Sequence, residues 1–81
     1  MPQFFFDVHE AALVMTDDVG SDFRDTEAAR REAAKALGEI VRDGLLQSLE
    51  TRAFRMVVRD SLGMVLFQLS LAFDAESPSL I

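Results

Sequence analysis

The chain contains a single histidine, His9, and no cysteine. A Cys–His pair is therefore impossible, and a serine triad would have to recruit this one imidazole. The sequence has no G-x-S-x-G turn or comparable nucleophile motif. A histidine at the end of a short apolar stretch is typically a surface residue. We therefore expect no catalytic residue and no enzymatic activity.

Aspartates gather in the segment TDDVGSDFRD, residues 16–25. Hard cations such as Ca²⁺ need several carboxylate oxygens, but an EF-hand-like loop places them at alternating positions with glycine sixth, and this segment fits no such register. Weak cation binding is the alternative to turn formation and helix capping, which we favour. Gly20 and Gly63 are isolated turn glycines, not a phosphate-binding loop. The four aspartates of the segment 16–25, Asp17, Asp18, Asp22 and Asp25, are therefore not expected to form a metal site. We also expect no cofactor.

Arginines recur along the segment RAFRMVVRD. Arg55 and Arg59 fall on one face of a predicted strand, and Phe5 can share that face. Basic and aromatic side chains on a sheet can hold single-stranded nucleic acid. The net charge of −6, from 8 basic and 14 acidic residues, repels a phosphate backbone. We expect pairing with Asp7 or Glu50, or an edge strand protected by charge. Nucleic-acid or regulatory binding through Arg55 and Arg59 is the alternative function.

Short apolar runs near residues 3–9 and 12–16 predict two strands. If His9 faces Ala12 across a turn at Glu10 and Ala11, the strands form a hairpin. That register pairs Val8 with Leu13 and Phe6 with Met15.

A helix is predicted near residues 26–44, with Asp25 capping its first turn. Gly44 can end it, or it can continue through LLQSL. Phe23 should tuck under the helix. The predicted apolar stripe contains Ala29, Ala33, Ala36, Leu37, Ile40, Val41, Gly44 and Leu45.

The second half predicts a hairpin of strands near 52–59 and 64–73, closed by Asp60 and Gly63. The tail, residues 74–81, is expected to fray. The register pairs Val58 with Val65, Met56 with Phe67 and Phe54 with Leu69 on the core face, and Val57 with Leu66, Arg55 with Gln68 and Arg59 with Met64 on the reverse face.

These elements predict one α+β domain, residues 1–81, with a four-stranded, mainly antiparallel sheet and one amphipathic helix on one face in the order ββαββ. The strand order stays open. The arrangement 2-1-3-4 is favoured because it keeps neighbours antiparallel and makes the helix a right-handed crossover.

The chain resembles a family of short, uncharacterised alphaproteobacterial proteins labelled a domain of unknown function, over roughly residues 3–73. The matching features are Phe4-Phe5-Phe6-Asp7, the acidic turn with Gly20, Phe23 and Asp25, the helix start with Ala28, Ala29, Glu32 and Ala33, and Val58-Arg59-Asp60 with Gly63. The family more often has Tyr as its first aromatic and Gly in the first turn. The resemblance implies a ββαββ architecture and no particular chemistry.

Size and composition point to self-association. A chain of 81 residues buries only about 60 to 65 % of its unfolded surface. Its apolar share is 49 % before glycine is counted, and no disulfide can stabilise it. With no bilayer-crossing segment, we expect a cytoplasmic interaction module, forming a homodimer or binding an unidentified protein partner.

Phe5 is the residue that suggests where the chain associates. In a strand, Phe4 and Phe6 point to the helix and Phe5 to the helix-free face. Self-association is expected through this face or a strand edge, unless residues 45–51 or the tail SLI cover Phe5 within one chain. The expected interface residues are Phe5, Val57, Leu66, Met64 and Val14.

Overall fold

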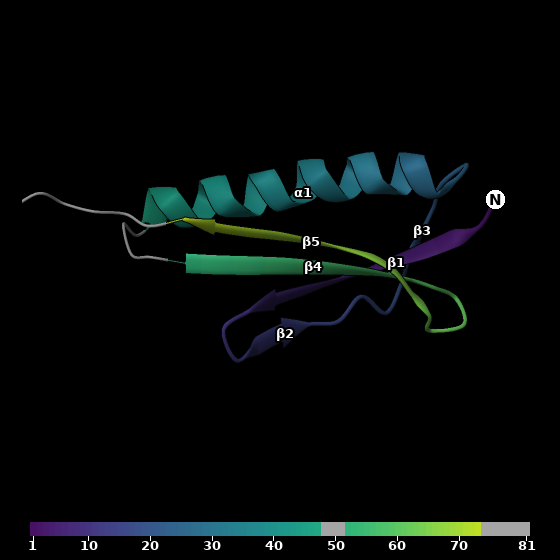
Figure 1. The fold of residues 1–81 in the computed structure, drawn as a ribbon, viewed down its shortest axis with the longest axis horizontal. Coiled ribbons are helices and arrows are strands. Elements are labelled where there is room, and N and C mark those ends of the chain that lie inside the picture. Colours follow the sequence, from purple (N-terminus) through teal and green to yellow (C-terminus); the bar gives the residue numbers. More distant parts are fainter. Residues whose placement is uncertain (48–51, 74–81) are drawn as a thin grey trace, which may run out of the picture.

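A computed structural model describes residues 1–47 and 52–73. One helix lies across one face of an antiparallel sheet (Figure 1), which confirms the predicted α+β class. The sheet order is β2-β1-β4-β5, the arrangement favoured from the sequence, and a further short strand, β3, also pairs with β1. The elements are β1 (Gln3–Glu10), β2 (Leu13–Met15), β3 (Ser21–Asp22), α1 (Thr26–Gln47), β4 (Arg52–Asp60) and β5 (Val65–Phe73).

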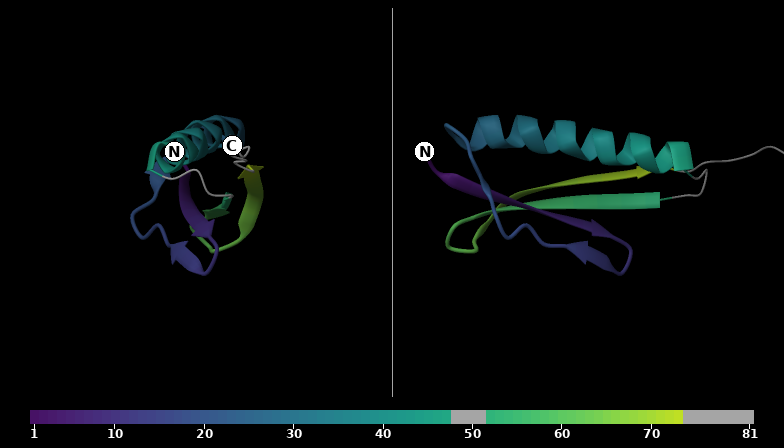
Figure 2. Two further views of the ribbon diagram at one scale, coloured as in Figure 1. Left: turned by 90° about the vertical axis from the view of Figure 1, so that its left-hand side faces the viewer. Right: turned by 180° about the vertical axis from the view of Figure 1, so that it is seen from behind.

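The core lies between α1 and the sheet, and the end-on view in Figure 2 shows all strands on the same side of the helix. Ala29 and Ala33 are completely buried, because their small side chains let the first half of α1 approach the strands closely. The predicted apolar stripe of the helix is confirmed for its described side chains. The buried core residues are Phe4, Val8, Ala29, Ala33, Leu37, Val41, Phe54, Met56 and Val58.

The start of α1 forms as predicted. Asp25 Oδ1 accepts a hydrogen bond from the backbone N–H of Ala28 over 2.8 Å, which satisfies one free donor of the first turn. Phe23 packs edge-on against Phe4 and Phe6, with ring centroids 6.0 and 5.7 Å away. The helix continues past the buried Gly44 to Gln47.

The predicted register of the first hairpin is wrong by two residues. The turn lies at Ala11 and Ala12, and Ala11 has a positive φ of 52°. Neither Glu10 nor Ala11 is a glycine, so no residue fixes the turn at the predicted position, one residue earlier. The shift keeps every side chain on its predicted face, since side chains alternate with a period of two. The observed pairs are Val8 with Met15, His9 with Val14 and Glu10 with Leu13.

The predicted register of the second hairpin is also wrong by two residues. Asp60 does bond the turn, accepting from the N–H groups of Leu62 and Met64, and Gly63 has the expected positive φ, at 86°. However, the Asp60 N–H donates to the Met64 carbonyl. The pair that closes the hairpin is therefore Asp60 with Met64, one residue later than the predicted pair of Asp60 with Gly63. A bulge at Val58 and Arg59 adds the second shift.

The shift at the turn and the shift at the bulge are one residue each, so together they return the side chains of β5 beyond the bulge to their predicted faces. Val65, expected in the core, is half exposed, at 50 %. The observed core-face pairs are Val58 with Phe67, Met56 with Leu69 and Phe54 with Leu71; on the reverse face Val57 meets Gln68, Arg55 meets Ser70 and Arg59 meets Val65.

No helix among the described residues is both long and apolar enough to cross a bilayer. The expectation of a frayed tail at 74–81 lies outside the described residues.

Candidate functional site

The helix-free face of the sheet carries the residues singled out from the sequence. β1 and β4 are direct neighbours, so each residue of one strand on this face lies beside a residue of the other. The three pairs are Phe5 with Arg59, Asp7 with Val57 and His9 with Arg55.

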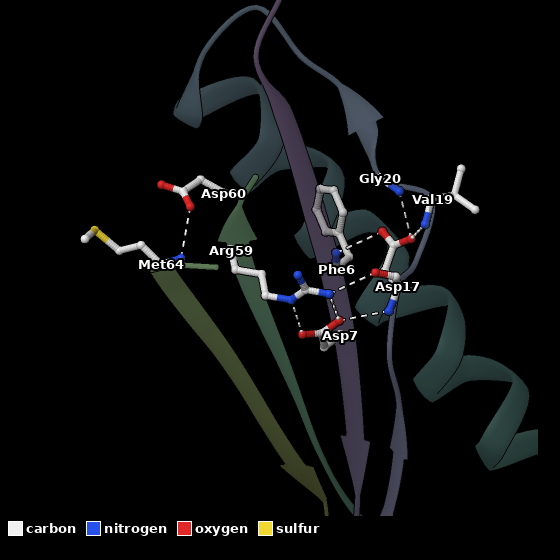
Figure 3. A network of polar contacts seen from close by, with 8 residues as sticks. All are labelled: Phe6, Asp7, Asp17, Val19, Gly20, Arg59, Asp60 and Met64. Atoms are coloured by element: carbon white, nitrogen blue, oxygen red, sulfur yellow. Dashed lines mark hydrogen bonds and ion pairs between the residues drawn. The ribbon is translucent and has the colours of Figure 1, made fainter. Parts of the chain in front are cut away.

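Arg59 forms an ion pair with Asp7 across the two strands (Figure 3). Its Nε donates to Asp7 Oδ2 over 2.7 Å and its Nη2 to Oδ1 over 3.2 Å, a two-pronged contact that fixes both side chains. The same Nη2 also donates to the Asp17 carbonyl over 2.9 Å. The hydrogen bond from Arg59 holds the pKa of Asp7 below its usual value, although burial opposes the shift. The predicted pairing of Arg59 with Asp7 is confirmed.

Asp17 fastens the segment 16–20 to the sheet. This segment leaves the sheet edge between β2 and β3, which both pair with β1. Asp17 Oδ2 accepts the Phe6 N–H over 3.0 Å, so a side-chain carboxylate replaces a strand carbonyl at the gap. The Asp17 N–H donates to Asp7 Oδ1 over 2.9 Å, while its Oδ1 accepts from the N–H groups of Val19 and Gly20.

We call Asp7, Asp17 and Arg59 the clamp. Burial raises the pKa of Asp17, but the backbone N–H groups that it accepts outweigh burial and leave its pKa lowered. Among the described residues, no buried side-chain nitrogen or oxygen lacks a hydrogen-bond partner. The clamp therefore has its polar groups engaged internally and holds a loop in place.

Phe5 is covered within its own chain. The guanidinium carbon of Arg59 lies 5.0 Å from the ring centroid, a cation–π contact. On Gly20, whose φ is 75°, a Cβ would lie only 2.7 Å from Phe5 Cε2, so the backbone of this loop touches the ring. The two segments considered from the sequence, residues 45–51 and the tail SLI, have side chains outside the described ones.

The structure does not gather the five expected interface residues into one patch. Phe5 is half-buried, and Val57 is 9 % exposed. Val14 pairs with His9 near the first turn, whereas Met64 and Leu66 lie at the second turn, beyond Arg59. Val14, Met64 and Leu66 are exposed.

The remaining chemical candidates have separate positions. His9 Nδ1 lies 3.3 Å from Arg55 Nη2, and both line a shallow hollow on the helix-free face. Asp17 and Asp25 act in a turn and a helix cap, as expected. In the described part of the chain, no three histidines or acidic residues lie close enough to hold a metal ion.

The sequence reasoning missed the role of Asp17 in covering Phe5. It assigned this aspartate to its own turn, which is correct, but not to the Phe6 N–H eleven positions earlier. Two features of the sequence could have indicated this role. Alternation sets Phe5, Asp7 and Arg59 on one face of the sheet, and the acidic segment that contains Asp17 follows β2 directly.

Comparison with known proteins identifies a family but no activity. The model of a family described as "Domain of unknown function (DUF6894)" matches residues 3–72. No curated protein and no solved structure gives a significant match. Since the match spans most of the 81 residues, the chain belongs to the DUF6894 family.

Proposed function

We propose that this protein is a small, non-enzymatic interaction module of the cytoplasm that forms a homodimer, and that the outer edge of β5 is the dimer seam. The observation that carries the proposal is this edge strand. β5 is nine residues long, VLFQLSLAF, with no charged residue and no proline. It ends the sheet order, and no other described strand pairs with its outer side.

A strand of this kind is a template for pairing. Soluble proteins usually protect a long edge with lysine, proline, a bulge or a covering segment. Here the one irregularity, at Val58 and Arg59, lies at the start of β5 and leaves the following ladder regular. Three of its apolar side chains are substantially exposed: Val65, Leu66 and Leu71.

Charge favours a second copy at this edge over most other parts of the surface. The chain carries a net charge of −6, so two copies repel each other wherever acidic residues meet. Pairing of β5 with itself brings no charged residue of either strand into the seam. An antiparallel pair centred on Leu69 would set Leu69 opposite itself and Phe67 opposite Leu71. Phe67 and Leu69 are only partly buried against the core, and a second copy would complete their cover.

The position of α1 agrees with this arrangement. α1 contacts both β4 and β5. Strands are spaced about 4.8 Å apart, so a two-fold axis at the β5 edge would bring the two helices to about 10 Å, a normal packing distance. Ala34 lies beside Leu69 on the flank of α1 nearest β5, and Gly38 follows one turn later. Gly38 is exposed, and a Cβ there would meet no atom within 4 Å. From Ala34 onward, small residues on this flank would permit close helix contact, whereas Arg30 and Arg31 lie on its first part.

The helix-free face is the less favoured seam because the chain's own loop covers its centre at Phe5. The alternative function, nucleic-acid binding, is weakened in the same way. Arg59 is already engaged by Asp7 and by the Asp17 carbonyl, and only Arg55 of the proposed pair faces a neutral partner.

Light scattering on a sizing column, from about 1 to 100 µM, tests the proposal. We expect a dimer for the unchanged chain and a monomer for Leu71→Lys, because two lysines would enter an apolar seam. Met15→Lys is the matched control: Met15 is exposed to a similar degree but lies on β2, at the opposite edge, so this variant should stay dimeric. Circular dichroism confirms that each variant is folded.

A monomer at every concentration would overturn self-association. A dimer that survives Leu71→Lys would overturn the β5 seam alone. In that case, loss of the dimer in Val14→Lys would move the seam to the helix-free face, since Val14 lies beside His9 on β2.

A further inference from the structure

The hollow beside His9 on the helix-free face has a volume of about 440 Å³. It forms at the end of the sheet away from the clamp. There the small side chains of β4 and β5 leave space beside the longer side chains of His9 and Arg55. Ala53 and Arg55 come from β4, and Ser70 and Ala72 lie directly opposite them on β5. His9 completes the polar side from β1. The hollow is complete within one chain, so it does not depend on the proposed dimer.

Arg55 is the unusual group in this hollow. Every other arginine with a described side chain forms an ion pair with a carboxylate. Those pairs are Arg24 with Asp25, Arg30 and Arg31 with Glu27, Arg42 with Asp43, and Arg59 with Asp7.

Arg55 instead donates to His9 Nδ1, over 3.3 Å, which provides a hydrogen bond but no negative charge when the imidazole is neutral. Its neighbours on the sheet face are Ala53, Val57, His9 and Ser70. On the face of Arg55, the acid that β1 carries is Asp7, and it is engaged by Arg59.

We propose that this hollow binds a small organic monocarboxylate with a short apolar body, and that Arg55 is its anchor. The guanidinium can give two parallel N–H bonds to a carboxylate. The Ser70 hydroxyl lines the hollow and is a further donor.

The composition of the hollow selects the charge and shape of the ligand. It holds one permanent cation, so a single negative charge is matched, whereas a phosphate dianion would remain half-compensated in a protein of net charge −6. The other side chains that these strands present on this face are the small apolar ones of Ala53 and Ala72, which leave room for a short hydrocarbon or a ring.

Titration of the ¹⁵N-labelled chain, followed by NMR, tests this site. The probe is hexanoate, with hexanamide as its neutral counterpart and inorganic phosphate as the second anion. We expect saturable shifts at His9, Ser70 and Ala72 in the millimolar range with hexanoate. At the same concentrations, hexanamide and phosphate should bind at least tenfold more weakly.

Arg55→Gln should weaken hexanoate binding at least tenfold, and Ser70→Ala severalfold. Arg42→Gln is the matched control, since it removes an exposed arginine of α1 and should leave binding unchanged. Shifts that never saturate, equal binding of hexanamide, or full binding by Arg55→Gln would each overturn the proposal. Tighter binding of phosphate or of a single-stranded oligonucleotide would also overturn it and would revive the nucleic-acid alternative.

Discussion

The guanidinium of Arg59 lies over the ring of Phe5, with 5.0 Å from the guanidinium carbon to the ring centroid. The same group is held by Asp7 on the neighbouring strand, so the ring is covered by a cation that cannot readily leave. Phe4 and Phe6 face the helix, and Phe5 is half-buried against Arg59 and the backbone at Gly20. A run of three phenylalanines is thereby accommodated in a domain with one helix.

The glycines provide a graded test of this packing. Gly20→Ala should destabilise the fold most, because it combines a positive φ with a Cβ that would lie 2.7 Å from Phe5. The positive φ alone costs about 1–2 kcal/mol, and the clash adds to it. Urea unfolding measures the loss.

Gly63→Ala and Gly38→Ala are the matched controls. Gly63 has a positive φ but open space, so its variant should lose only the conformational part. Gly38 is helical with open space, so alanine should stabilise the monomer by up to about 1 kcal/mol. Equal losses at Gly20 and Gly63 would show that the contact with Phe5 carries no energy.

Removing the carboxylate of Asp17 should release the segment 16–20. Asp17→Ala leaves the Phe6, Val19 and Gly20 N–H groups without this acceptor. Hydrogen bonds to a charged group contribute about 1.5–3 kcal/mol each in favourable cases, so we expect a loss of about 2–3 kcal/mol in urea unfolding. Amide exchange at Gly20 should accelerate. Asp18→Ala, at the exposed neighbouring position, should change stability by less than about 0.5 kcal/mol.

Asp7 and Arg59 should show energetic coupling. A double-mutant cycle with Asp7→Asn and Arg59→Gln isolates their interaction, and we expect a coupling free energy of about 1–3 kcal/mol. The side chains are 13 % and 24 % exposed, so solvent screens this pair less than a surface pair. The exposed pair of Arg42 and Asp43 is the comparison, with an expected coupling near zero. Additive effects at Asp7 and Arg59 would contradict a stabilising clamp.

Acid should unfold the protein through the clamp. The pKa values of Asp7 and Asp17 are lower in the folded chain than in the unfolded chain, so the unfolded state takes up protons first as the pH decreases. Their contribution is complete above the unfolded pKa of about 4 and is lost as the pH falls through the folded values.

Urea unfolding at pH 7, 5, 4 and 3, at one protein concentration, measures this dependence. The free energy of unfolding should decrease below about pH 5. The double variant Asp7→Asn and Asp17→Asn should show a shallower decrease, and an equally steep one would assign the acid sensitivity to other carboxyl groups.

Local patterns were enough to predict the class of fold. The apolar stripe of α1, the cap at Asp25 and the alternation in β4 each depend on residues a few positions apart, and each is confirmed. Except at Val65, which lies between the second turn and the bulge, the side-chain faces survived both register errors, because the total shift in each hairpin was two residues.

Local sequence patterns did not predict the exact register of the strands. In the second hairpin, the sequence identified Asp60 and Gly63 as turn residues, but the closing pair and the bulge depend on which backbone groups meet across the strands. β3 was missed because two residues, Ser21 and Asp22, carry no periodic signal.

The order of residues in β1 is enough to predict that Phe5 faces away from the helix and needs a cover, because alternation in a strand is a local property of the backbone. The identity of that cover, Arg59 and the loop at Gly20, follows from the folded chain alone, since Asp17 must reach a backbone N–H left open between β2 and β3. Contacts between segments depend on register and loop path, and neither is encoded in the spacing of neighbouring residues.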